Sequence, residues 1–302
     1  GCAPYKTIVG HGFILDEKGY KMSKSGGNGL SPIKLSSQYG ADVLRLWLAG
    51  CDYSADVRIG DNILKGYADI YKRIRGTFCY LLGNLNGFTE KDKLDYENLS
   101  DMDKWVLHKV YEVDKVVRQS ILDFDFPVLV NVVHNFCSRE LSSFYFDICK
   151  DVLYCDTVDD VKRKSVQTVL DIVFNHLVHW LSPIIPFTTE EAWLAYNGLT
   201  IDDMEVSIHL NTFPVVNEIW NKPELDIKWQ KIQEVRSVVT GALEIKRAEK
   251  MLGSALESAP KVYITDKELF NIVKSTNFSD ICITSNIELI ADAAPSFAFT
   301  DK

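Results

Sequence analysis

The chain has 302 residues, of which 46% are hydrophobic and 25% are charged. This is the composition of a globular protein with one large domain or two to three small ones, and it excludes global disorder and a disulfide-stapled miniprotein. The formal net charge of −9 excludes a nucleic-acid-binding protein that works by bulk positive charge, but it leaves room for a basic face on an acidic body.

The first 60 residues mix strand, loop and helix signals. Residues 5–15 are β-branched and apolar, which predicts a strand. Residues 21–32 are rich in Lys, Ser and Gly and end at a proline, which predicts a mobile loop. Residues 36–50 carry apolar side chains at helical spacing and stop at Gly50, a residue suited to end a helix.

The middle of the chain reads as an antiparallel helical bundle. Asp61 is a good N-cap for a helix that ends near residues 85–87, and further helices are predicted over 101–122, 127–153 and 159–181. Pro186 opens a short fifth helix, in which Thr188 and Glu191 have capping-box spacing.

The last third of the chain changes character. Residues 197–223 are irregular, and a helix fits 225–252. A strand over 261–265, a helix over 268–274 and a strand over 281–284 then predict a small α/β appendix. The fold class is therefore mainly α, and we expect domains at 1–60, 61–223 and 224–302.

No metal site or membrane segment is indicated. The seven cysteines are irregularly spaced without a Cys-x-x-Cys pair, so we expect no zinc module and a reducing, cytoplasmic environment. No apolar run reaches membrane-spanning length. His176 and His179 have a spacing that metal ligands can use, but no third ligand accompanies them, and we interpret both as packing or surface residues.

One loop, residues 21–28, carries chemistry. Its two lysines, Lys21 and Lys24, are three residues apart among small residues that let the backbone approach an anion. Two close ammonium groups suit a triphosphate whose negative charge shifts to a leaving pyrophosphate. Neither the P-loop pattern nor Gly-x-Gly-x-x-Gly occurs. On spacing alone, a solvated surface loop is the alternative.

The motif Lys21-Met22-Ser23-Lys24-Ser25 is, letter for letter, the KMSKS signature of class I aminoacyl-tRNA synthetases. The flanking segments 11–16, 27–28 and 39–45 resemble the same family, at the point where its Rossmann catalytic domain meets its helical domain. Segments 141–147, 150–154 and 165–170 resemble the isoleucyl-tRNA synthetases in particular. The valine, leucine and methionine enzymes share this architecture and stay open as alternatives.

The resemblance implies an ATP site and the reaction that uses it. Lys24 would stabilise the ATP phosphates as aminoacyl-adenylate forms, Lys21 would support it, and Met22, Ser23 and Ser25 would complete the phosphate site. ATP with Mg²⁺, isoleucine and tRNA(Ile) are the implied partners of a monomeric enzyme. The family's His-Ile-Gly-His signature is absent. We therefore expect a C-terminal piece of a longer ligase that cannot activate an amino acid alone.

In this family the helical bundle binds the anticodon stem and loop of tRNA. Basic residues suited to phosphate contact occur in two predicted helices: Lys65, Lys72, Arg73 and Arg75, and then Lys162, Arg163 and Lys164. The alternative for each cluster is the charged outer face of an ordinary amphipathic helix. Trp105, Trp220 and Trp229 are candidates for base stacking or for core packing. A non-catalytic tRNA-binding module is the remaining alternative for the chain as a whole.

Overall fold

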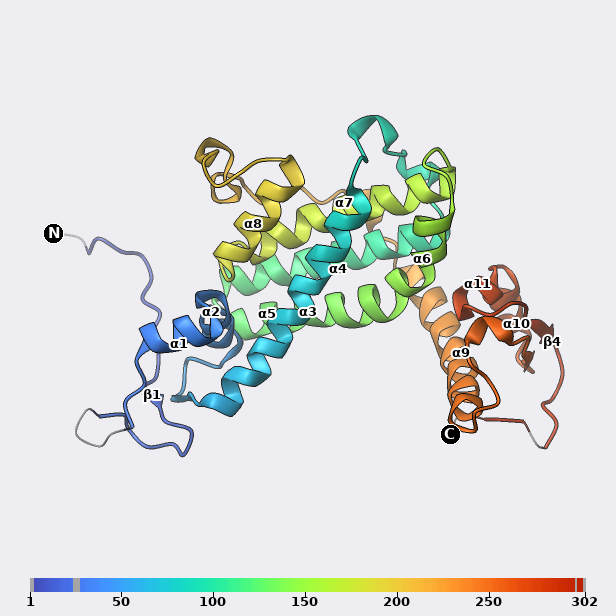
Figure 1. The fold of residues 1–302 in the computed structure, drawn as a ribbon, viewed down its shortest axis with the longest axis horizontal. Helices are drawn as coiled ribbons and strands as arrows, with labels where there is room; N and C mark the ends of the chain where they lie inside the picture. Colours follow the sequence, from blue (N-terminus) through green and yellow to red (C-terminus); the bar gives the residue numbers. More distant parts are fainter. Residues whose placement is uncertain (1–2, 24–27, 297, 301–302) are drawn as a thin grey trace.

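The computed structural model describes residues 3–23, 28–296 and 298–300, and it is mainly helical, as predicted. Figure 1 shows three parts in chain order: an N-terminal part with α1 and α2, a central bundle from α3 to α8, and a C-terminal part that α9 connects to the bundle. In the described part of the chain, no helix is both long enough and apolar enough to cross a lipid bilayer.

The N-terminal part contains little regular structure. β1 (Ile14–Leu15) pairs in parallel with β2 (Val57–Arg58), so the strand predicted over 5–15 is confined to its last two residues. The helix predicted over 36–50 is two helices, α1 (Pro32–Tyr39) and α2 (Ala41–Gly50). Gly40 separates them with a φ of 89°, a backbone angle that glycine adopts without steric cost.

The bundle follows the predicted helices closely. Its elements are α3 (Asp61–Leu85), α4 (Asp101–Leu122), α5 (Phe126–Asn135), η3 (Phe136–Tyr145), α6 (Phe146–Cys155), α7 (Val161–Leu181) and α8 (Pro186–Asn197). The predicted helix 127–153 is thus one continuous rod, α5–η3–α6, whose middle ten residues form a wider π-helix.

Two predicted caps are wrong. Gly60 is the N-cap of α3, and Asp61 lies in the first turn, where its carboxylate pairs with Lys65 instead. Thr188 lies inside α8, and its hydroxyl donates to Asp42 of another helix rather than forming a capping box. Asp61 instead makes a contact within its helix, and Thr188 makes a contact between two helices. The local sequence pattern does not reveal either contact.

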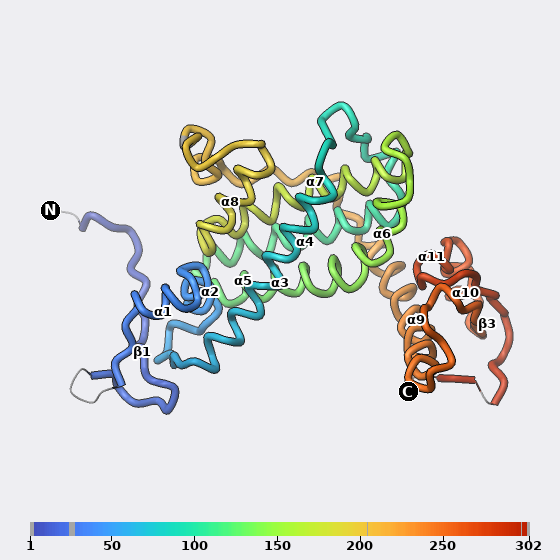
Figure 2. Tube along the Cα trace, viewed as in Figure 1, coloured from blue at the N-terminus to red at the C-terminus, as the bar shows by residue number. Residues whose placement is uncertain are grey.

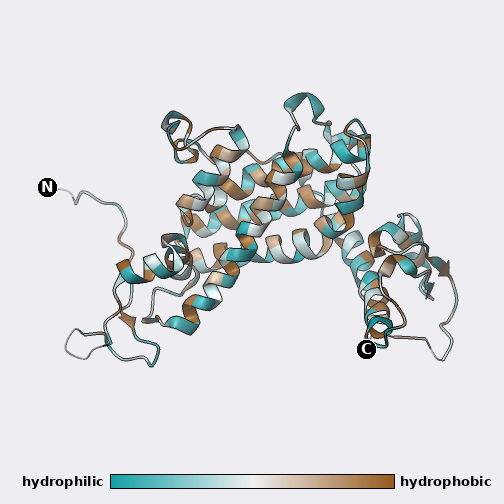
Figure 3. Cartoon of the chain, in the orientation of Figure 1, coloured by the Kyte–Doolittle hydropathy of each residue, from teal (hydrophilic) through white to brown (hydrophobic). Residues whose placement is uncertain are grey.

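The core of the bundle lies around α7, which has buried residues on all sides. Figure 3 shows hydrophobic positions on the facing sides of the packed helices. A helix that is apolar around its circumference belongs inside a protein. The largest fully buried side chains are Trp105, Trp180, Tyr145, Phe136 and Phe174.

The C-terminal part is built on α9 (Pro223–Ala248), which packs on α4, α10 (Lys267–Lys274) and α11 (Phe278–Cys282). β3 (Lys261–Tyr263) pairs in parallel with β4 (Glu288–Ile290). The strand predicted over 281–284 is wrong, because its residues end α11 and Ile283 turns the chain with a φ of 57°.

Short 3₁₀ turns connect these elements. They are η1 (Glu90–Asp92), η2 (Tyr96–Asn98), η4 (Met204–Val206), η5 (Ile208–Leu210), η6 (Glu218–Trp220) and η7 (Ala255–Glu257). Figure 2 shows the irregular segment after α8 passing along the bundle toward α9. Trp220, Trp229 and Trp105 are all buried, so the core-packing alternative holds for these three tryptophans.

Candidate functional sites

The base of the loop after β1 is closed by the side chain of Asn28. Its amide donates to Asp16 Oδ2 at 2.9 Å and to the carbonyl of Lys21 at 3.2 Å, and its Oδ1 accepts from the backbone N–H of Ser23 at 3.0 Å. Asp16 also accepts from the N–H groups of Lys18 and Tyr20. These hydrogen bonds lower the pKa of the Asp16 carboxyl, and the bond from Asn28 has the largest effect.

Of the five residues in the signature, three are described. Lys21 is exposed and forms a bridge with Leu15, and Ser23 is exposed next to it. Met22 is partly buried and packs on an apolar cluster that includes Trp47 and Leu64. Lys24 and Ser25, the other two residues predicted to contact ATP, lie outside the described residues. Met22 and Asn28 together fix the first half of the loop to the folded part of the chain.

The N-terminal part is held to the bundle through α2. Buried Asp42 accepts from the backbone N–H and the hydroxyl of Thr188, at 2.7 and 2.6 Å, at the start of α8. One turn later, Arg45 donates to the carbonyls of Pro183 and Ile184, at 2.8 and 3.0 Å, after the end of α7. α2 thus binds both sides of the turn between α7 and α8. Asp42 accepts hydrogen bonds from the start of α8, and Arg45 donates hydrogen bonds to the carbonyls that follow α7.

The basic residues of α3 differ in their partners. Lys65 pairs with Asp61 at 2.6 Å and Lys72 pairs with Asp69 at 3.0 Å, each within the helix. All four side chains are more than half exposed, and such pairs stabilise a fold only weakly. A phosphate can therefore replace either carboxylate at small cost.

The two arginines of α3, Arg73 and Arg75, have no carboxylate partner in the described part of the chain. Arg75 lies against Cys79 Sγ at 3.9 Å, and Arg73 lines a groove beside the helix. Both guanidinium groups are thus left with hydrogen-bonding capacity for an external anion.

The basic residues of α7 are more engaged in the fold. Arg163 donates to the carbonyl of Asp156 at 2.8 Å, and Lys164 lies 3.2 Å from Asp92 and 3.4 Å from Asp159. Lys162 is exposed at the first turn. Figure 1 shows that α7 begins at the opposite end of the bundle from the start of α3. The two predicted clusters therefore form two separate surfaces.

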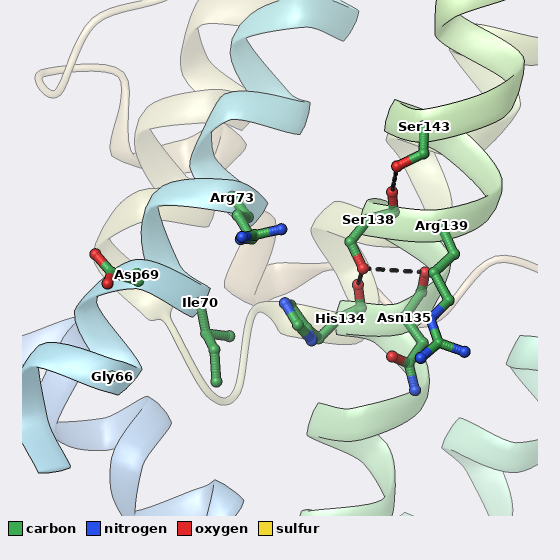
Figure 4. A pocket seen from close by; sticks show the side chains of 9 residues that line it. All are labelled: Gly66, Asp69, Ile70, Arg73, His134, Asn135, Ser138, Arg139 and Ser143. Carbon is green, nitrogen blue, oxygen red and sulfur yellow. Dashed lines mark hydrogen bonds between the residues drawn. The ribbon is translucent and has the colours of Figure 1, made fainter. Parts of the chain in front are cut away.

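The groove beside α3 is lined by two further basic residues, His134 and Arg139, that were not predicted from the sequence. Its volume is about 460 Å³, and its walls are α3 and the segment where α5 becomes η3. Figure 4 shows Arg73 projecting from α3 into the space facing His134. Arg139 of η3 also lines the groove. No sequence signal marks Arg139 or His134, because neither belongs to a motif or to a cluster of basic residues.

The histidine pair of α7 is used in packing. His176 Nδ1 lies 2.8 Å from the carbonyl of Ile172, and its ring meets those of Trp180 and Trp220. His179 makes the equivalent contact one turn later, with its ring against Trp193. Burial lowers the pKa of both imidazoles.

Three other side chains lie close enough to hold a metal ion: His108, Glu112 and Asp226. The ammonium group of Lys109 already bridges the two carboxylates, at 2.8 Å from Glu112 and 2.6 Å from Asp226. A lysine in this position offsets part of the negative charge and links α4 to α9, while His108 Nε2 is buried without a hydrogen-bond partner among the described residues.

Comparison with known proteins places this geometry in a family. Residues 103–264 match the model for the anticodon-binding domain of tRNA ligase, and residues 1–60 match the model for class I tRNA synthetases of the I, L, M and V type. The chain belongs to the family of anticodon-binding domains of tRNA ligases. The first of these matches covers more than half of the sequence and includes the bundle from α4 to α8 and the whole of α9, whereas α3 lies between the two matched ranges.

Relatives among characterised sequences are isoleucine–tRNA ligases. The ligase of Ruegeria pomeroyi is 47% identical over 301 residues, and that of Agrobacterium fabrum is 44% identical over 299 residues. Each match covers 99% of this chain and 30% of the relative, so the chain spans about a third of the length of these ligases. The predicted resemblance to isoleucyl-tRNA synthetases is confirmed.

A solved structure supports the fold. A LeuRS–tRNA–LeuAMS ternary complex from Agrobacterium radiobacter K84 matches with a TM-score of 0.55 over 70% of this chain and 24% of that chain, at 19% identity. The predicted fold class, a class I anticodon-binding bundle in a mainly helical chain, is confirmed.

Proposed function

We propose that this chain is the segment of an isoleucine–tRNA ligase that supplies an ATP loop and binds the anticodon stem of tRNA(Ile). The observation that carries the proposal is the signature at residues 21–25, with its base closed by Asn28, directly ahead of a helical bundle of the anticodon-binding family. Residues 1–60 end the catalytic domain, 61–223 form the bundle and 224–302 form a small C-terminal domain.

The loop acts on the phosphates of ATP. When the carboxylate of isoleucine attacks the α-phosphorus, the bond to the β-phosphate oxygen breaks and pyrophosphate leaves with the negative charge. Lys24 stabilises that developing charge and Lys21 supports it, while Met22, Ser23 and Ser25 shape the loop around the phosphates. Mg²⁺ enters as the complex with ATP. Because the amino-acid site belongs to the rest of the ligase, the isolated chain activates no amino acid.

The bundle positions the RNA. Lys65, Lys72, Arg73 and Arg75 of α3 contact phosphates at one end, and Lys162, Arg163 and Lys164 of α7 contact them at the other. The exposed α3 pairs support this role, since each lysine exchanges an intrahelical carboxylate for a phosphate oxygen. The ligase works as a cytoplasmic monomer with ATP, isoleucine and tRNA(Ile) as its partners.

Isoleucine-dependent ATP–pyrophosphate exchange tests the catalytic half of the proposal. In the intact ligase, Lys24→Ala is expected to lower kcat about a hundredfold, because a group that stabilises transition-state charge is lost. The matched control is Lys18→Ala, an exposed lysine outside the signature. Unchanged exchange by the Lys24 variant, or exchange by the isolated chain, contradicts this role.

A further inference from the structure

The groove between α3 and the α5–η3 segment is a preformed polar recess. Its lining includes two arginines, a histidine and two serines, and it contains a single acidic residue, Asp69. That carboxylate is paired with Lys72 at 3.0 Å, and Figure 4 shows it turned away from Arg73. The groove therefore presents net positive charge on a protein that carries a net charge of −9.

The two arginines of the groove are available to a ligand. Within residues 3–23, 28–296 and 298–300, neither Arg73 nor Arg139 has a carboxylate within salt-bridge distance. They come from different elements: Figure 4 shows Arg73 projecting from α3 toward His134, and the guanidinium group of Arg139 beside Asn135 on the other wall. A guanidinium group recognises phosphate through paired N–H donors.

His134 supplies a third group on the floor of the groove. Its Nε2 atom is buried and has no hydrogen-bond partner among the described residues. Burial and the nearby charges of Arg73 and Arg139 lower the pKa of this imidazole. A buried nitrogen without a partner is costly, and a phosphate oxygen in the groove would accept its hydrogen bond.

The π-helix makes this arrangement possible. In the wider turn, Ser143 Oγ donates to the carbonyl of Ser138 at 2.7 Å, and Ser138 Oγ donates to the carbonyl of His134 at 2.8 Å, as Figure 4 shows. The hydroxyl protons satisfy the backbone of η3, so they do not compete for the groove. Single π segments inside α-helices are frequent at functional sites.

We propose that this groove binds a phosphodiester group of the tRNA backbone, held between Arg73 and His134, with Arg139 adding positive charge farther along the second wall. The inference rests on the proposed function, and it names the site where the bundle grips RNA. The groove is open and offers no aromatic wall for a base, so it reads the backbone rather than the sequence.

Titration of the chain with labelled tRNA(Ile) and with an anticodon-swapped tRNA tests the groove. Arg73→Gln and Arg139→Gln are each expected to weaken binding of both RNAs about tenfold. Each should also reduce the slope of log K against log salt concentration by about one. Lys91→Gln, which removes an exposed cation of η1 outside the groove and outside both proposed phosphate-binding clusters, is the matched control and is expected to weaken binding less. Circular dichroism confirms that each variant is folded.

The outcomes separate the two proposals. If the unaltered chain binds neither RNA, the proposed function fails. If it binds tRNA(Ile) and both arginine variants bind equally well, the groove proposal alone is overturned. ATP and inorganic phosphate are added as competitors at millimolar concentration. If ATP displaces tRNA from the unaltered chain, and Arg73→Gln abolishes that displacement, the groove binds a free nucleotide and the RNA assignment is overturned.

Discussion

Asp42 and Thr188 are 146 positions apart in sequence, and their side chains are joined by a hydrogen bond of 2.6 Å. The same carboxylate oxygen accepts the backbone N–H of Thr188, in the first turn of α8, where N–H groups have no partner within the helix. Tyr71 of α3 lies 2.9 Å from the Thr188 hydroxyl. Three elements thus meet at the junction between the loop-bearing part and the bundle.

Asp42→Ala is expected to destabilise the chain by about 2 kcal/mol, because it leaves buried donors of α8 without an acceptor. Urea denaturation followed by circular dichroism measures the free energy of unfolding. The control is Asp202→Ala, an exposed carboxylate in an irregular segment, which is expected to change that free energy by less than about 0.5 kcal/mol. Equal effects of the two substitutions would show that the junction contributes nothing.

Asn28→Ala is expected to loosen the base of the loop. The substitution removes three hydrogen bonds that hold Asp16, Lys21 and Ser23 together. Proteases cut segments that open locally, so trypsin should cleave after Lys21 several-fold faster in the variant. Asn98→Ala, at an exposed position far from the loop, controls for the loss of an asparagine. Cleavage at the same rate in both variants would contradict the structural role of Asn28.

Much of the bundle was predictable because its signals are local. The helix over 101–122 follows from Ser100 and Asp103, which form a capping box, and from apolar positions at helical spacing. The strand predicted over 281–284 is wrong because the apolar residues Ile281 and Cys282, which suggested a buried strand, are instead buried as part of a helical turn. A short apolar run does not distinguish a strand from a helical turn.

The candidate sites were predictable only where a motif marks them. The signature at residues 21–25 identifies its own loop, but the groove depends on which helices become neighbours. Arg73 and His134 are about sixty positions apart, and the wide turn of η3 that brings His134 and Arg139 to one groove has no distinct sequence pattern. Tertiary packing decides such sites.

The buried imidazole of His176 predicts a loss of stability in acid. Burial lowers its pKa in the folded state below the value of about 6.5 that it has in the unfolded chain, so the unfolded state takes up the proton first. This contribution is present above pH 6.5 and is lost as the pH falls through and below that value, with a slope of at most about 1.4 kcal/mol per pH unit. Urea denaturation between pH 5 and 8 measures it.

The variant His176→Phe keeps a flat ring against Trp180 and Trp220 and removes the titrating group. Its free energy of unfolding is expected to depend less steeply on pH than that of the unaltered chain. His209→Gln, at an exposed histidine, is the control and should leave the slope unchanged. An unchanged or steeper pH profile for His176→Phe would contradict the assignment.

His134 predicts that RNA binding strengthens in mild acid. Its pKa is lowered in the free chain by burial and by Arg73 and Arg139, and a phosphate in the groove would favour the protonated ring. The other charged groups that line the groove are Arg73, Arg139 and Asp69. Affinity for tRNA(Ile) should therefore rise as the pH falls from 8 to 6, and His134→Gln should remove that rise. Persistence of the full rise in this variant would exclude His134 as its source.

We propose that the bundle recognises tRNA(Ile) through its anticodon arm. The most direct measurement is titration of this chain with labelled tRNA(Ile) beside an anticodon-swapped version, at two salt concentrations. We expect salt-sensitive binding that the anticodon swap weakens, because phosphate contacts give affinity and loop bases give selectivity. Equal and weak binding of both RNAs at both salt concentrations would contradict it.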